Sequence, residues 1–188
     1  DHPTVAPLTN VAATIAAVRG ATTRSLGLPG LVVLHGPSGW GKSTAAAYAA
    51  VQLRGYYVQC QTLWSRTDFL VAVAREMGLE TKGRMAQVAD RISEQLTMSG
   101  RPLLIDEAHV LVERATGAGA LKDIHDATGG AILLIGEEML PQRMTRFERL
   151  HGRVLEWVGA QPCSLADTVA LARIYAPGIE LAPDLVGK

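Results

Sequence analysis

A glycine-rich loop that ends in lysine and serine constrains the fold of this chain more than any other feature. Residues 36–43 read Gly-Pro-Ser-Gly-Trp-Gly-Lys-Ser and fit the pattern G-x-x-x-x-G-K-[ST]. The apolar run Leu31–Leu34 precedes the loop, and helix-forming residues follow it from Lys42 to Arg54. Glycines let backbone N–H groups converge on phosphate oxygens, and the N-terminus of the next helix adds a positive dipole. The order strand, loop and helix therefore predicts a phosphate-binding loop.

The loop also predicts which parts of a nucleotide its side chains contact. We expect the Lys42 ammonium to reach the β- and γ-phosphates and the Ser43 hydroxyl to bind Mg²⁺. ATP and Mg²⁺ are therefore the predicted ligands. The predicted nucleotide-binding residues are Gly36, Pro37, Ser38, Gly39, Trp40, Gly41, Lys42, Ser43 and Thr44.

Two acidic residues follow a second apolar run. The segment from Pro102 to Ile105 reads as a strand, and it ends on Asp106 and Glu107. At the carboxyl end of a buried strand, Asp106 is placed to bind Mg²⁺, and we expect this strand to neighbour the strand before the phosphate-binding loop. Glu107 is placed to polarise an attacking water. The pair favours ATP hydrolysis over phosphate transfer to a small molecule.

A third strand end carries two more acids. The run from Ala131 to Ile135 is followed by Gly136-Glu137-Glu138. A second glutamate close to Glu107 and to phosphate is unfavourable, because like charges repel at short range. Glu137 therefore either points away or orients water through a hydrogen bond. A solvated helix start is an equally good interpretation.

Four arginines form the most basic stretch of the chain. They are separated by three, three and four residues, so one face of a helix is expected to carry them all: Arg143, Arg146, Arg149 and Arg153. An arginine presented to the γ-phosphate of a neighbouring subunit would act as an arginine finger. The alternative is a solvated helix face. We interpret the scattered basic residues, Lys82, Arg84 and Arg91 among them, as surface charges.

Short apolar runs alternate with helical segments along the chain, which is typical of a parallel sheet covered on both faces. The sequence thus predicts a three-layer α/β P-loop NTPase fold with five parallel strands. The expected divisions are an N-terminal helical segment (1–30), an ATPase core (31–160) and the start of a small helical lid (161–188). Within the core we expect a helix behind the cap Thr67-Asp68, and His109 and His125 are interpreted as packing or capping residues.

Composition excludes some classes of protein. Hydrophobic residues make up 48% of the chain and charged residues only 19%, which excludes wholesale disorder. Eighteen basic and eighteen acidic residues cancel, so a uniformly basic nucleic-acid-coating protein is not indicated, although a local basic patch is compatible. Two cysteines and the lack of a signal peptide or apolar span predict a cytoplasmic protein without a membrane partner. Because the chain starts at Asp1, we expect it to be part of a longer one.

The motifs together resemble the AAA+ ATPases of the transposition-regulator type, the group of phage Mu B protein and TnsC. The resemblance spans Leu31 to Val158 and rests on GPSGWGKS, LLIDEAH, the segment 121–130 followed by ILLIGEE, and RFERLHGRV. It implies that Arg153 is the arginine finger, with Arg149 as second choice, and that Glu137 occupies the sensor 1 position, where the family has asparagine or threonine. It also implies that Arg173 is the lid-domain sensor 2.

The same resemblance implies partners. Proteins of this type bind duplex DNA without sequence specificity in the ATP state, assemble filaments or rings on it and recruit a DDE-type transposase; hydrolysis disassembles the filament. The main alternative is an ATPase similar to the ExeA type, which acts on protein partners in secretion or assembly. The string Asp106–His109 also suggests a DEAH-type helicase, against which the single short motor domain argues.

Overall fold

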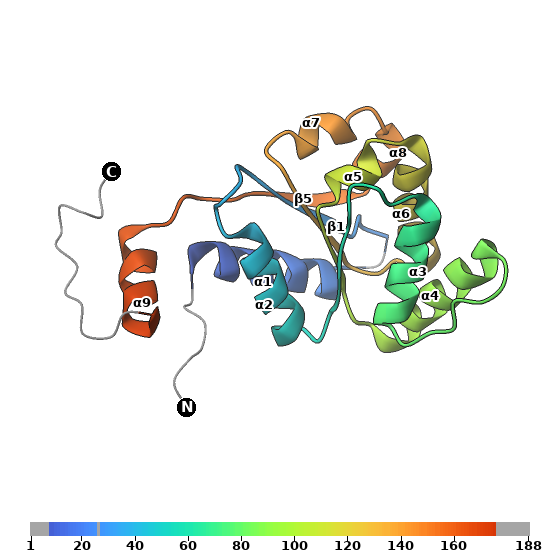
Figure 1. Cartoon of the computed structure of the whole chain (residues 1–188), viewed down its shortest axis with the longest axis horizontal. Coiled ribbons are helices and arrows are strands. Elements are labelled where there is room, and N and C mark those ends of the chain that lie inside the picture. Colours follow the sequence, from blue (N-terminus) through green and yellow to red (C-terminus); the bar gives the residue numbers. More distant parts are fainter. Residues whose placement is uncertain (1–7, 26, 176–188) are drawn as a thin grey trace.

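Five parallel strands form the centre of the molecule in a computed structural model that describes residues 8–25 and 27–175 (Figure 1). Their order across the sheet is β2-β3-β4-β1-β5, and every neighbouring pair runs parallel. The predicted parallel five-stranded sheet is thus confirmed. The strands are β1 (Leu31–His35), β2 (Tyr56–Gln59), β3 (Leu103–Asp106), β4 (Ile132–Gly136) and β5 (Val154–Gly159).

Apolar side chains on both faces of the sheet explain why it is covered twice. In β1, Leu31 and Val33 pack into one buried cluster, whereas Val32 and Leu34 pack into the other. This alternation follows from the two-residue period of a strand. β3 and β4 are buried along their whole length, so the apolar parts of LLIDEAH and ILLIGEE lie inside the core.

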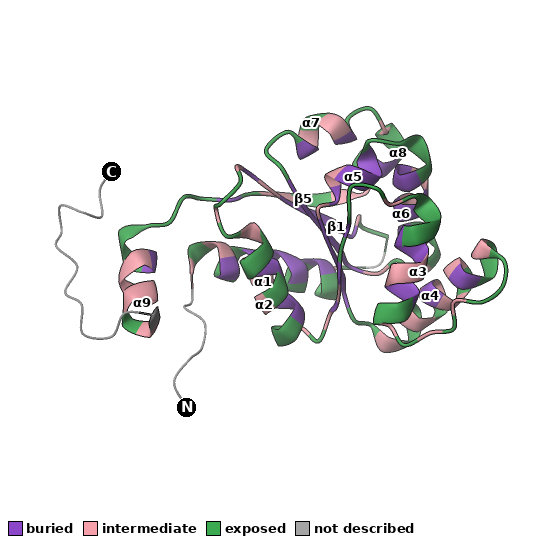
Figure 2. Ribbon diagram, in the orientation of Figure 1, coloured by how far each residue is buried: buried purple, intermediate pink, exposed green. Residues whose placement is uncertain are grey.

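Helices cover the two faces unequally. α1 (Thr9–Thr23) and α2 (Lys42–Gln52) pack on one face, while α3 (Arg66–Glu76), α4 (Met85–Ser99) and α6 (Ala115–Thr128) cover the other (Figure 1). Buried residues lie along the helix faces that meet the sheet (Figure 2). Ala17 and Ala21 of α1 share a cluster with Ala46 and Ala49 of α2, and these small side chains allow close packing. α1 therefore packs as part of the core.

The start of α3 differs from the sequence expectation. Ser65, not Thr67, is the N-cap: its hydroxyl accepts from the Asp68 N–H, and the Asp68 carboxylate accepts from the Ser65 N–H at 2.8 Å. This reciprocal pair satisfies two of the amide donors that a helix start leaves free. Phe69, buried as the helical spacing predicts, anchors the helix to the sheet.

The four arginines do not share a helix face, so that prediction is wrong. Between β4 and β5 the chain forms two short helices, α7 (Leu140–Met144) and α8 (Glu148–His151), with Arg143 in the first, Arg149 in the second, Arg146 between them and Arg153 just before β5. Phe147 breaks the helical path with φ −120° and ψ 72°, and its ring packs against the core. This non-helical residue separates Arg143 and Arg146 from Arg149 and Arg153.

α9 (Leu165–Tyr175) extends from the main body after β5 (Figure 1). The Asp167 carboxylate accepts hydrogen bonds from Thr9 N and from Ser164 N, which ties the start of α9 to the start of α1. The predicted lid continues past Tyr175 and so lies partly outside the described residues; the division into domains stays a prediction. In the described part of the chain, no helix combines the length and the apolar character that crossing a membrane requires.

Candidate nucleotide site at the carboxyl edge of the sheet

The carboxyl ends of β1, β3 and β4 surround a cavity of about 390 Å³. β4 lies between β1 and β3, so the expectation that Asp106 neighbours the phosphate-loop strand is wrong. The segment that follows β4, which carries Glu137, therefore lies beside the phosphate-binding loop that follows β1. The cavity is lined by Ser38, Gly39, Gly41, Lys42, Ser43, Thr44, Asp106, Glu107, Gly136 and Glu137.

Backbone geometry shapes the loop between β1 and α2. Gly41, the N-cap of α2, has φ +74°, a conformation that L side chains rarely adopt. A Cβ on Gly36 would lie 2.9 Å from the Ala160 Cβ, so only glycine fits beside the segment after β5. No side chain in the described ranges caps the N-terminus of α2. Its N–H groups are therefore left for an anion, which is what a phosphate requires.

The charged and hydroxyl groups of the loop face the same cavity. The Lys42 ammonium donates to the Pro37 carbonyl at 2.7 Å, and Ser43 and Thr44 line the cavity beside it. On the outer side, Asn10 Nδ2 donates to the Trp40 carbonyl at 2.8 Å and so links α1 to the loop. Lysine, hydroxyl and free amides together match the chemistry of a nucleoside triphosphate.

Asp106 is held rigidly at the end of β3. The residue is 1% exposed, and both carboxylate oxygens accept hydrogen bonds, from Tyr57 Oη and from Glu107 N, each at 2.8 Å. Burial, and then the hydrogen bond to Asp106, raise the pKa of Tyr57, so its hydroxyl remains a donor. A fixed carboxylate that lines the same cavity as the Ser43 hydroxyl fits a hydrated Mg²⁺.

Glu107 and Glu137 both face the imidazole of His109. His109 Nδ1 lies 3.3 Å from Glu107 Oε2, and His109 Nε2 lies 3.7 Å from Glu137 Oε1. The other Glu137 oxygen pairs with Arg143 Nη2 at 3.1 Å. His109 therefore lies between the two carboxylates whose mutual repulsion the sequence indicates, and Arg143 pairs with one of them.

The other predicted residues lie elsewhere. Arg153, at the amino end of β5, pairs with Asp126 on α6 through two hydrogen bonds of 2.5 and 2.8 Å. Arg149 is exposed on α8, and Arg173 is exposed on α9; neither lines the cavity. Arg153, Arg149 and Arg173 therefore do not reach the cavity of their own chain.

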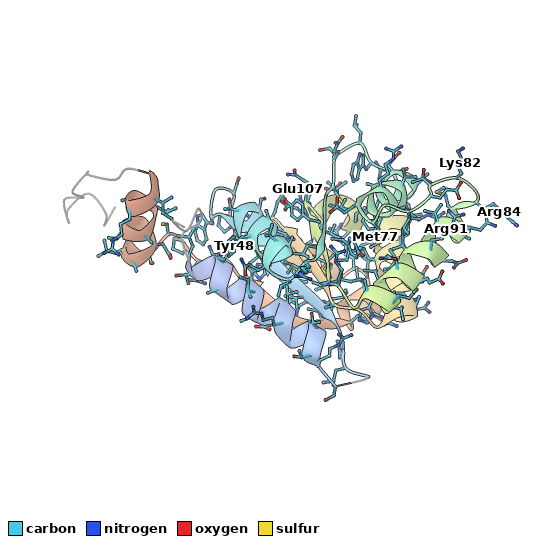
Figure 3. The ribbon with its side chains drawn as sticks, turned by 90° about the horizontal axis from the view of Figure 1, so that it is seen from below. Tyr48, Met77, Lys82, Arg84, Arg91 and Glu107 are labelled. Carbon is cyan, nitrogen blue, oxygen red and sulfur yellow. The ribbon has the colours of Figure 1, made fainter. Side chains whose placement is uncertain are left out.

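The scattered basic residues lie apart from the cavity as well. Lys82, Arg84 and Arg91 lie at the end of the molecule formed by the α3–α4 connection, away from Glu107 (Figure 3). Arg91 Nη1 donates to the carbonyls of Glu80 and Lys82 at 2.6 and 3.1 Å, which folds this connection onto α4. Arg91 thus has a structural role in addition to its charge.

Sequence reasoning missed three contributors to the site, namely Tyr57, His109 and Arg143. The sequence predicts a packing or capping role for His109, and it predicts that Arg143 shares one helix face with three other arginines. Three of their contacts join residues 49, 28 and 6 positions apart along the chain, namely Tyr57 to Asp106, His109 to Glu137 and Arg143 to Glu137. The DEAH string was a signal for His109, because it places an imidazole two residues after Glu107.

Comparisons with known proteins agree with this geometry. A family model described as an AAA domain matches residues 26–144, and no curated protein matches the sequence. The chain is similar to the Orc1 protein of Aeropyrum pernix, solved in complex with DNA, with a TM-score of 0.66 and 18% identity over 97% of this chain and 54% of that one. It is also similar to PCH-2 of C. elegans, with a TM-score of 0.52 and 17% identity over 82% of this chain and 42% of that one.

These similarities concern the fold. The chain spans about half the length of the Orc1 structure, and identities below a fifth carry no functional detail. The predicted P-loop NTPase fold is confirmed by the shared architecture.

Proposed function

Because the chain belongs to the AAA domain family, we propose that it binds ATP and Mg²⁺ in the cavity at the carboxyl edge of the sheet and hydrolyses the ATP. The observation that carries this proposal is the convergence of Lys42, Ser43, Asp106 and Glu107 on one cavity from β1–α2 and β3. Lys42 and the loop amides would bind the phosphates. Ser43 and Asp106 would hold Mg²⁺.

The chain supplies the remaining chemistry through Glu107. Bound Mg²⁺ would neutralise charge that develops on the phosphate oxygens. Glu107, whose side chain is 42% exposed at the cavity, would accept a proton from the attacking water. Its backbone hydrogen bond to Asp106 keeps the base beside the metal ligand.

An arginine from a second copy would complete the site. Arg153 and Arg149 are the two candidates, and Arg153 is already paired with Asp126 within its own chain. Mixing a Lys42→Ala chain with an Arg149→Ala or an Arg153→Ala chain tests both. If one of these arginines acts in trans, its alanine variant is inactive alone. Hydrolysis then returns when that variant is mixed with the Lys42→Ala chain, at the sites in which an intact loop meets an intact arginine.

At the level of biology, we propose a regulator of DNA transposition that self-associates on duplex DNA in the ATP state and recruits a DDE-type transposase. The support is the resemblance of LLIDEAH, ILLIGEE and RFERLHGRV to that group of ATPases, together with a fold like that of Orc1, a protein solved in complex with DNA.

Filament formation on duplex DNA tests this assignment. We expect binding and assembly on DNA with ATP, and weak DNA binding with ADP or without nucleotide. One chain of zero net charge is expected to attract DNA phosphates weakly, so affinity must come from assembly of many chains. DNA binding that ignores the nucleotide, or no binding, would contradict it.

An ATPase of the ExeA type, acting on protein partners, is the second candidate. Zero net charge favours it, as does the commitment of Arg143 and Arg153 to partners within the chain. A salt titration separates the two functions. A phosphate interface that contacts several phosphates loses affinity steeply as salt rises. An ATPase that acts only on protein partners should show no DNA binding at physiological salt.

A further inference from the structure

We propose that His109 is a positioning residue that holds the Glu107 carboxylate, and that Glu137 acts on ATP hydrolysis through His109 instead of touching nucleotide or water. The inference rests on the proposed ATPase function and assigns the link between the ends of β3 and β4.

The backbone of Glu107 is fixed, but its carboxylate is not. Glu107 has φ +54°, which is unusual for a residue with a side chain, and its N–H donates to Asp106 while the next amide, of Ala108, donates to the Ile135 carbonyl at 2.8 Å. These contacts leave the side chain 42% exposed. A catalytic base needs a defined orientation, so another group has to supply it.

His109 is placed to supply that orientation. Its side chain is 14% exposed, and Nδ1, 3.3 Å from Glu107 Oε2, is a buried nitrogen with no hydrogen-bond partner of good geometry in the described residues. Buried polar atoms are nearly always satisfied. A hydrogen bond from Nδ1 to Glu107 Oε2 would satisfy this nitrogen and orient the carboxylate.

Glu137 lies on the opposite side of the imidazole. Its Oε1 lies 3.7 Å from His109 Nε2, and its Oε2 pairs with Arg143, whose guanidinium also pairs with Glu113 Oε1 at 3.2 Å. The chain Glu107–His109–Glu137–Arg143 therefore ends on an anchored ion pair. An imidazole between two carboxylates separates the like charges that would otherwise repel.

Steady-state ATPase kinetics test the order of this chain. We expect His109→Ala to lower kcat about tenfold to a hundredfold with KM for ATP within about twofold, because a displaced base slows chemistry without weakening phosphate binding. Added imidazole should restore part of the loss. Glu94→Ala, at an exposed position of α4 that does not line the cavity, is the control and should retain wild-type kinetics with or without imidazole.

A double-mutant cycle distinguishes action through His109 from direct action. Glu137→Gln should lower kcat about fivefold in the wild-type chain and have no further effect in the His109→Ala chain. The same fivefold loss in both backgrounds would show that Glu137 contacts water or nucleotide directly. A rise in KM equal to the fall in kcat would also overturn the inference. If His109→Ala unfolds the chain, His109→Asn, which retains one donor, replaces it.

Nuclear magnetic resonance of the His109 ring nitrogens separates this inference from the proposed ATPase. If wild-type and Glu107→Gln chains hydrolyse ATP equally slowly, the ATPase proposal fails. The ring signals still report the contacts: we expect both Glu107→Gln and Glu137→Gln to shift them without nucleotide. Unchanged signals in both variants would overturn the inference whatever the ATPase result.

Discussion

Charged side chains are paired at one end of the parallel sheet and are left open to a ligand at the other. At the amino end, Asp126 pairs with Arg153 and Lys122, and the His125 ring accepts from Gly30 N at 3.1 Å. At the carboxyl end, Lys42 contacts only a carbonyl of its own loop among its described hydrogen bonds, and the Glu107 side chain is 42% exposed. Charges at the first end satisfy each other and stabilise the fold, whereas Lys42 and Glu107 at the second are available to a ligand.

Lys42→Ala should have the largest effect and the least structural cost. Without the ammonium, ATP binding and hydrolysis are expected to fall by at least about a hundredfold, because no other cation lines the described cavity. The thermal midpoint should change little, since Lys42 makes one hydrogen bond to a backbone carbonyl. Nucleotide titration and thermal unfolding of the same preparation measure both. Undiminished ATP binding would show that the carboxyl end is not the nucleotide site.

Tyr57→Phe should weaken Mg²⁺ binding by Asp106. Removing the hydroxyl leaves Asp106 Oδ2 without its donor, so the carboxylate is less firmly oriented toward a metal. We expect the Mg²⁺ concentration that half-saturates nucleotide binding to rise about fivefold, which corresponds to the loss of about one hydrogen bond. Binding measured without Mg²⁺ is the control and should not change. An unaltered Mg²⁺ requirement would mean that Tyr57 only packs.

Asp126→Asn should act at the other end and on stability alone. Hydrogen bonding from Arg153 holds the pKa of Asp126 below its ordinary value of 3.8. The ion pair therefore stabilises the fold above about pH 4, and the stabilisation is lost as the pH falls through the lower folded-state value. We expect the variant to lose about 1 kcal/mol of unfolding free energy at pH 7 and ATP binding to remain.

Denaturant unfolding from pH 7 to pH 2 checks the sign of that prediction. The difference between wild-type and Asp126→Asn chains should shrink as the pH falls below 4, because the Asp126 carboxylate then takes up a proton in the unfolded chain before it does so in the folded chain. A difference that is constant across this range would show that the amide perturbs packing and that the charge is irrelevant.

The sequence alone predicted the parts that depend on local pattern. The loop 36–43 and the strand ending on Asp106 were recognisable because their chemistry requires particular residues at particular spacing. The alternation of apolar runs and helices likewise indicated the five parallel strands. Strand order was not recoverable in this way, since a motif marks the end of a strand but not its neighbour. β4 therefore appeared between β1 and β3 only in the structure.

Residues whose role depends on a distant partner were harder to predict. Arg153 fits a regular arginine spacing, yet it pairs with Asp126, 27 positions away. Tyr57 is one of two consecutive tyrosines in β2, and only the pairing of β2 with β3 brings its hydroxyl to Asp106. Local spacing carries no information about such contacts.

Hydrogen exchange with and without ATP and Mg²⁺ tests the contrast between the two sheet ends most directly. We expect amides of residues 36–44 and of Asp106 and Glu107 to exchange more slowly when nucleotide is present, while those of 122–126 exchange at unchanged rates. Protection of 122–126, or no protection of the loop at saturating ATP, would contradict this contrast.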